Sequence, residues 1–142
     1  MIIVSLENKN IYHTFVPNLK QTKMKRDKII YYVATGLLTV MMLMSAGMYV
    51  FKNEMISEMF VSFGYPTYII YPLAVAKVLG LFAIWNPNFK ALKEWAYAGF
   101  FFDFVLAFFA HYMIGDGEQT GAIIAMILLL ASYIFNKRRH QA

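Results

Sequence analysis

Three ionisable side chains interrupt long apolar stretches of the sequence, where a charge is costly. Lys77 lies within the run of residues 66–85, and Asp103 and His111 lie within the run of residues 95–115. Insertion scales put the cost of one charge near the middle of a bilayer at about 2.5 to 3.5 kcal/mol or more, so such residues need a partner or a function. Together the three side chains form a candidate intramembrane polar pocket that could hold a quinone or a lipid headgroup, or relay protons.

The spacing of Lys77 and Asp103 predicts that they form an ion pair. Lys77 is eight residues from Trp85 at the end of its run, and Asp103 is eight residues from Trp95 at the start of the next. Both therefore lie about 12 Å from the same side of the membrane, and consecutive spans joined by a short loop are antiparallel neighbours. Removing one partner of a buried pair should destabilise the protein more than removing both. A functional site and a structural ion pair are equally good interpretations.

His111 lies eight residues beyond Asp103, and an outer acidic turn with Asp116 and Glu118 follows it. These residues could continue a proton path or line a cavity for a polar headgroup. The structural alternative, a histidine that hydrogen-bonds to a neighbouring helix, is favoured. No metal is expected, because the other two histidines lie outside the apolar runs and no set of ligands with a recognisable spacing remains.

Four apolar runs supply the elements that must position these side chains. A bilayer core about 30 Å thick needs roughly 20 residues of helix. The runs comprise residues 29–51, 66–85, 95–115 and 121–135. The last is short unless Gln119 and Thr120 are included, yet it has no polar face. We therefore expect an all-α membrane protein, an up-and-down bundle of four transmembrane helices.

Helical spacing predicts a further short helix and the buried faces of the spans. In the loop after the first run, apolar residues recur every three or four positions and predict an outer interfacial helix. These residues are Met55, Ile56, Met59, Phe60 and Phe63. In the third run, a stripe of small and polar residues that includes Gly99, Asp103 and His111 is expected to face the bundle. The opposite side, expected to face lipid, carries Phe101, Phe102, Val105, Phe108, Phe109 and Tyr112. Gly80 is expected to permit close helix approach beside Lys77.

The composition agrees with a membrane protein. Of 142 residues, 60% are hydrophobic and only 15% are charged, and the mean hydropathy is +0.51, whereas a soluble domain is about 25% charged. The chain has no cysteine, which excludes disulfides, iron–sulfur clusters and thiol chemistry within it. It also has no phosphate-binding loop, nucleophile elbow or zinc-protease motif.

Lysine and arginine residues gather at alternate ends of the runs. Six precede the first run, two lie between the second and third, and three follow the fourth, whereas the first loop has Lys52 alone and the third loop has none. Because positive residues that flank spans stay on the cytoplasmic side, both termini are predicted to be cytoplasmic, in a bacterial inner membrane. The basic residues behind the net charge of +5 thus serve to orient the chain in the lipid bilayer, and no nucleic-acid partner is expected.

The sequence divides into three parts on this interpretation. Residues 1–28 form a polar, basic N-terminal arm, residues 29–135 form the membrane domain, and residues 136–142 form a basic tail. Met24 begins the stretch Met-Lys-Arg-Asp-Lys, which is typical of the start of a membrane protein. We expect Met24 to be the native initiator and the residues before it to be an upstream extension or a disordered arm.

Several stretches of the second and third runs carry recognisable motifs. They are residues 65–80, residues 92–103 with the run Lys-Glu-Trp-Ala-Tyr-Ala-Gly, and the shorter pieces 110–111 and 115–117. They resemble the DoxX-like family of small bacterial four-helix membrane proteins, over residues 29–135. The resemblance implies a four-helix bundle and association with quinone-linked oxidoreductases, notably in thiosulfate oxidation, or with oxidative-stress complexes. The residues to which it points are Lys77, Gly80, Glu94, Trp95, Gly99, Asp103, His111 and Asp116.

Three hypotheses for function follow. The first is an accessory membrane subunit of a quinone-linked redox or oxidative-stress system, without catalytic activity of its own, with a quinone as candidate ligand and an oxidoreductase or further copies of the chain as partner. The second is a small proton-coupled transporter in which Asp103 or His111 changes protonation; four spans are few for this, so a dimer is expected. The third is a structural membrane scaffold without chemistry.

Overall fold

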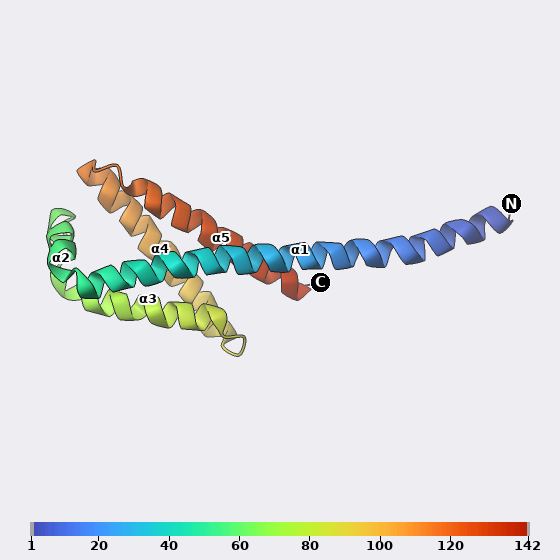
Figure 1. The fold of residues 1–142 in the computed structure, drawn as a ribbon, viewed down its shortest axis with the longest axis horizontal. Coiled ribbons are helices and arrows are strands. Elements are labelled where there is room, and N and C mark those ends of the chain that lie inside the picture. Colours follow the sequence, from blue (N-terminus) through green and yellow to red (C-terminus); the bar gives the residue numbers. More distant parts are fainter. Residues whose placement is uncertain (1, 142) are drawn as a thin grey trace.

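The described part of the protein is entirely helical in the computed structural model. The structure describes the backbone of residues 2–141 and the side chains of residues 18–140. Its elements are α1 (Ile2–Phe51), α2 (Asn53–Ser62), the 3-10 turn η1 (Thr67–Ile69), α3 (Ile70–Trp85), α4 (Lys90–Ile114) and α5 (Gln119–Gln141). Figure 1 shows four long helices that run up and down, with α2 lying across one end. The predicted fold is confirmed.

Four helices are long and apolar enough to cross a membrane. These spans are Asn18–Phe51, Thr67–Trp85, Lys90–Ile114 and Gln119–His140. The last includes Gln119 and Thr120, which lengthens it beyond the apolar core of the run. α1 packs against α3 and α5, and α4 packs against the same two helices, so the spans close into a ring. The first and last spans of the chain are therefore direct neighbours.

The first span continues without a break into the N-terminal arm. α1 begins at Ile2, so residues 18–28 belong to the same helix as the span. These residues are mostly lysine, glutamine, methionine and arginine, which favour a helix once one has started. Residues 18–28 of the arm are therefore part of the first membrane helix and not a separate element. The side chains of residues 1–17 lie outside the described residues.

The short helix predicted in the first loop is present as α2. Its Ile56 and Phe60 side chains are buried and pack against Ile70 at the start of α3. α2 ends where Gly64 adopts a left-handed conformation (φ +77°) and the amide of Tyr65 donates to the carbonyl of Phe60 at 2.8 Å. This arrangement is a Schellman-type helix end, which a residue with a Cβ would disfavour. α2 thus caps one end of the bundle.

The buried face of α4 differs from the prediction. The core contacts come from Tyr97, Phe100 and Phe104, whereas Gly99 is exposed and has no other element within 4 Å of its Cβ position. The predicted stripe of small residues is therefore only the edge of the buried face. Aromatic rings are apolar enough for lipid and for a protein interior, so hydropathy does not fix which way they point. The large rings fit because Gly80 leaves room: a Cβ there would lie 2.9 Å from Cζ of Phe100.

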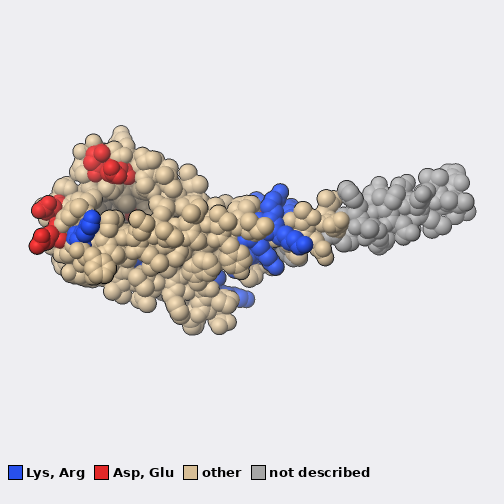
Figure 2. All heavy atoms as spheres, viewed as in Figure 1, with Lys and Arg blue, Asp and Glu red and all other residues tan. Residues whose placement is uncertain are grey.

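Charged side chains separate to the two ends of the bundle. On the face shown in Figure 2, lysine and arginine gather where α1 leaves the bundle, and aspartate and glutamate gather at the opposite end. We call these the basic end and the acidic end. The basic end holds Lys28, Lys90, Lys93, Lys137, Arg138 and Arg139, and the acidic end holds Glu54, Glu58, Asp116 and Glu118 together with one lysine, Lys52. This separation is what spans with alternately charged loops produce.

Candidate functional site

The predicted ion pair between α3 and α4 is present. The Nζ atom of Lys77 lies 3.3 Å from Oδ2 of Asp103. Both side chains are inside the bundle, with 6% and 16% of their surfaces exposed. Helical spacing places them on facing sides of antiparallel neighbours, as expected from their equal distance to the α3–α4 loop.

Lys77 has two further polar partners on α1. Its Nζ donates to Oγ of Ser45 at 3.0 Å and to the hydroxyl of Tyr49 at 3.4 Å, and it lies 4.5 Å from the centre of the Tyr49 ring. An ammonium group has three N–H donors, so Asp103, Ser45 and Tyr49 engage all of them. The lysine therefore joins α1, α3 and α4 through one buried group. Ser45 and Tyr49 are four residues apart on one helix face, and this spacing is the signal that could have revealed Tyr49.

His111 forms a separate polar centre at the acidic end. Its Nδ1 lies 2.7 Å from Oδ2 of Asp116, and its ring meets the edge of Phe63 near α2 at 4.9 Å between centres. The backbone amide of Glu118 donates to Oδ1 of Asp116 at 2.9 Å. The hydrogen bond from His111 lowers the pKa of the Asp116 carboxyl below its ordinary value. The structure thus groups His111 with the acidic turn, about 12 Å of helix away from Asp103.

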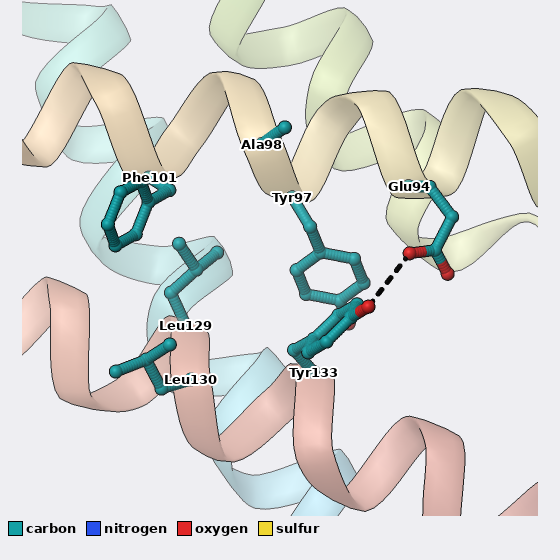
Figure 3. Close-up of a pocket in the computed structure, with 7 residues that line it drawn as sticks. All are labelled: Glu94, Tyr97, Ala98, Phe101, Leu129, Leu130 and Tyr133. Carbon is teal, nitrogen blue, oxygen red and sulfur yellow. Dashed lines mark hydrogen bonds between the residues drawn. The ribbon is translucent and has the colours of Figure 1, made fainter.

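A groove on the side of the bundle lies between α4 and α5, and neither residue of the ion pair lines it. It has a volume of about 280 Å³ and is lined by Glu94, Tyr97, Ala98, Phe101, Leu129, Leu130 and Tyr133. Figure 3 shows that Glu94 and Tyr133 meet at one end of the groove, while Phe101 and Leu130 lie toward the other. The Tyr133 hydroxyl donates to Oε2 of Glu94 at 3.1 Å. The groove is therefore polar at one end and apolar along its length.

Glu94 also forms an ion pair across the two helices. Nζ of Lys137 on α5 lies 2.7 Å from Oε1 of Glu94 on α4. The resemblance pointed to Glu94, but nothing in the sequence indicated that Tyr133 and Lys137 would be its partners. Glu94 is near the start of α4, whereas Tyr133 and Lys137 are near the end of α5, so the contacts between them depend on how the two helices are aligned rather than on any local spacing.

A chain of hydroxyl groups lies directly behind the groove. The Tyr97 hydroxyl is 2.8 Å from Oγ of Ser132, which is 2.7 Å from Oγ1 of Thr35. All three residues are buried, and they connect α4, α5 and α1. The three residues are at least 35 positions apart in the sequence, so no local spacing indicates that their hydroxyl groups would meet. Each hydroxyl would be costly without its neighbour, because lipid offers no alternative donor or acceptor.

The remaining residues to which the resemblance pointed do not share one site. Trp95 is 76% exposed on the outside of the bundle, Gly99 is exposed beside it, and Gly80 is covered by Phe100. Within the part of the chain that the structure describes, no three histidine, aspartate or glutamate side chains converge as a metal site would require. The polar features described so far are thus a buried ion pair, an acidic turn, a lateral groove and the chain of hydroxyl groups behind it.

Comparison with known proteins agrees with the features of this bundle. The model of the DoxX-like family matches residues 33–134, which is more than two thirds of the chain. No curated protein and no solved structure matches it. The match includes the second and third spans and parts of the first and fourth, and it contains the ion pair, the acidic turn and every residue that lines the groove; Lys137 and the basic tail lie outside it. The chain belongs to the DoxX-like family and is a multi-pass membrane protein.

Proposed function

We propose that this protein is an accessory membrane subunit of a quinone-linked redox or oxidative-stress system, and that the α4–α5 groove receives the quinone. The observation that carries the proposal is the pairing of a carboxylate and a phenol hydroxyl at one end of an otherwise apolar groove. Family membership supports the same direction. The protein's part is to bind and orient; the electron transfer belongs to an oxidoreductase partner.

The groove suits the headgroup and tail of a quinone. Binding pockets for such ligands are mostly apolar with a few polar groups that fix orientation. Tyr133 would donate a hydrogen bond to a quinone carbonyl, and Glu94 would accept one from the hydroxyl of the reduced form. Phe101 and Leu130 would pack against the ring and the tail. When bound, the quinone supplies a two-electron couple that the side chains of this chain do not provide.

Lys77 and Asp103 have a supporting role in this proposal. All three donors of the Lys77 ammonium already have partners, so a quinone carbonyl would have to displace one of them. Tyr133 needs only to turn its hydroxyl from Glu94 to a ligand beside it. The groove is therefore a better place for a quinone than the ion pair.

Equilibrium binding of decylubiquinone to the full-length protein in lipid nanodiscs tests the proposal. We expect Tyr133→Phe to weaken the binding of decylubiquinone, and Glu94→Gln to weaken the binding of its reduced form, decylubiquinol, each about three- to tenfold, because each substitution removes one hydrogen bond to that ligand. Leu130→Trp, which fills the groove with a larger apolar side chain, is expected to abolish binding.

Lys137→Met is the matched control for Glu94→Gln. Both substitutions break the ion pair between α4 and α5, but Lys137 does not line the groove. We expect Lys137→Met to change affinity less than about twofold, as a partly exposed ion pair contributes little. Absence of quinone binding to the unsubstituted protein, or equal losses in the two variants, would refute a quinone site in the groove.

Two other functions remain as outcomes of related measurements. A proton-coupled transporter would give substrate-dependent proton flux in liposomes that Asp103→Asn abolishes, and this result would replace our proposal. A scaffold without chemistry would bind no quinone, carry no flux and still assemble with its partner when Tyr133 and Leu130 are replaced.

We also infer that the basic end faces the cytoplasm, in a bacterial inner membrane. The support is the gathering of lysine and arginine at that end. Because the chain has no cysteine, single variants Glu118→Cys and Arg138→Cys give unambiguous labels. A membrane-impermeant maleimide should label the cysteine at position 118 in intact cells and the one at position 138 only after permeabilisation. The reverse pattern would invert the orientation.

A further inference from the structure

A second hollow lies at the basic end, outside the groove and the ion pair. It has a volume of about 420 Å³. Its walls include Lys28, Tyr31 and Tyr32 of α1, Trp85 at the end of α3, and Arg139 and His140 near the end of α5. Three of its lining residues are basic and none is acidic.

No acidic side chain lines this hollow, and the carboxylates nearest to it in the described residues already pair with other cations. Two carboxylates lie at the basic end among the described residues, and each has a cation beside it: Asp27 lies 3.6 Å from Arg26, and Glu94 lies 2.7 Å from Lys137. Arg139 forms no ion pair with any carboxylate in residues 18–140. Lys90 and Lys93 lie close enough to act on His140 electrostatically and add to the excess. An anion entering the hollow would therefore meet several cations without displacing an acidic side chain.

Arg139 is held in a fixed position by neutral groups. Its guanidinium lies 3.8 Å from the centre of the buried Tyr31 ring. Its Nε donates to Oδ1 of Asn136 at 3.2 Å, and its Nη1 donates to the hydroxyl of Tyr32 at 3.3 Å. A guanidinium has five N–H donors in a planar fork, so three remain available. A fork oriented in advance, with free donors, matches the paired oxygens of a phosphate.

The aromatic residues beside Arg139 place the hollow at the level of lipid headgroups. Trp85 and Tyr32 stack with their ring centres 6.2 Å apart, and Nε1 of Trp85 donates to Oγ1 of Thr39 at 2.9 Å. Tryptophan and tyrosine concentrate where the apolar core of a membrane meets its headgroups. Basic pockets between spans at this level recognise anionic headgroups.

We propose that the hollow at the basic end binds a phosphate group, supplied by an anionic phospholipid of the adjoining leaflet, with Arg139 as the principal contact. The assignment is independent of the quinone groove, since the two cavities share no lining residue. A phosphate carried by a soluble molecule has the same chemistry, and the experiment separates the two sources.

The test uses the full-length protein in a neutral detergent, titrated with fluorescent phosphatidylglycerol or fluorescent phosphatidylcholine. Inorganic phosphate in excess serves as competitor. Arg139→Gln is compared with Arg138→Gln, which removes the same charge from the next residue. Arg138 lies over Phe135 with 5.3 Å between its Cζ and the ring centre, and it does not line the hollow.

We expect Arg139→Gln to weaken phosphatidylglycerol binding about tenfold or more, because charge-assisted hydrogen bonds are lost, and Arg138→Gln to weaken it less than about twofold. Phosphatidylcholine should bind more weakly to the unsubstituted protein. Equal losses in the two arginine variants, or equal affinities for the two lipids, would overturn the proposal. Full competition by inorganic phosphate would overturn the lipid as the source and assign the site to a soluble phosphate.

Arg139→Lys keeps the proposal testable if Arg139→Gln does not fold. Lysine retains the charge but lacks the planar fork and its stacking on Tyr31. We expect about three- to fivefold weaker phosphatidylglycerol binding in this variant. Unchanged binding would show that diffuse charge, not the oriented guanidinium, holds the lipid, and the proposal would fail.

Discussion

Lys77 and Arg139 show two ways in which a membrane bundle can hold a cation. Lys77 lies inside the bundle, where a carboxylate and two hydroxyls engage all its donors. Arg139 lies at the basic end, where an aromatic ring, an amide and a phenol hold it and no carboxylate of the described residues neutralises it. The first arrangement is complete and joins helices. The second leaves donors free, and free donors on a fixed group are what a ligand requires.

The largest expected effect is on stability, when Lys77 is removed from its buried ion pair. Lys77→Met leaves Asp103 as an uncompensated charge inside the bundle, so we expect a loss of about 3 to 5 kcal/mol in the free energy of unfolding. The double variant Lys77→Met with Asp103→Leu should recover most of this loss. Thermal unfolding of the detergent-purified protein measures both. If the double variant were no more stable than the single one, the loss in Lys77→Met would not come from leaving Asp103 unpaired, and the structural role of the ion pair would be refuted.

A smaller loss is expected when a neutral polar group is removed from the interior. Ser132→Ala breaks the chain between Tyr97 and Thr35, and we expect a cost of about 1 to 2 kcal/mol. Ser62→Ala, at an exposed hydroxyl that bonds only to its own helix, is the control and should change stability by less than about 0.5 kcal/mol. Equal effects in the two variants would mean that the hydrogen bonds between the buried hydroxyl groups do not stabilise the packing of the helices.

The stability of Arg139→Gln sharpens the comparison with Lys77. The substitution removes a stacked cation and two hydrogen bonds to neutral groups but leaves no carboxylate unpaired. We expect a loss of about 1 kcal/mol or less in the free energy of unfolding, measured in the same detergent as the Lys77 variants. A loss as large as that of Lys77→Met would contradict the view that Arg139 is held for a ligand rather than for the fold.

The smallest effect is expected from the acidic turn. The hydrogen bond from His111 holds the pKa of Asp116 below its ordinary value of 3.8. The ionised carboxylate therefore contributes stability at pH values above 3.8, and this contribution disappears as the pH falls through the lower value of the folded protein. Thermal unfolding against pH should show Asp116→Asn slightly less stable than the unsubstituted protein near neutrality. The difference should vanish in strong acid; a constant difference would assign it to packing.

Much of the fold could be predicted because hydropathy and helical spacing are local signals. The four spans, the amphipathic α2 and the ion pair between Lys77 and Asp103 all follow from distances along the chain. The rotation of α4 could not be predicted, since Phe100 and Phe101 are equally apolar and only one of them is buried. In lipid, the rotation of a helix depends on how well its side chains pack against the neighbouring helices, and hydropathy carries no information about this packing.

The candidate sites were harder to predict for the same reason. Glu94 was indicated by the family resemblance, but its partners Tyr133 and Lys137 depend on how α5 is aligned with α4. Arg139 was assigned to topology, and its position over Tyr31 joins residues more than 100 apart in sequence. Counting charged residues identifies which end of a bundle is basic. Only the packing of the first and last helices shows that basic side chains line a hollow there.

The contact between α1 and α5 also sets an order for biogenesis. α1 leaves the ribosome before α5, yet Thr35 on α1 depends on Ser132 on α5 for its buried hydrogen bond. One side of α1 therefore stays uncovered in the bilayer until α5 has been synthesised. The earlier spans can assemble around Lys77, but only the final helix closes the ring. Premature termination in α5 would thus leave a partly assembled intermediate in which the sides of α1 and α4 that normally contact α5 are uncovered. Such an intermediate is a natural target for membrane quality control.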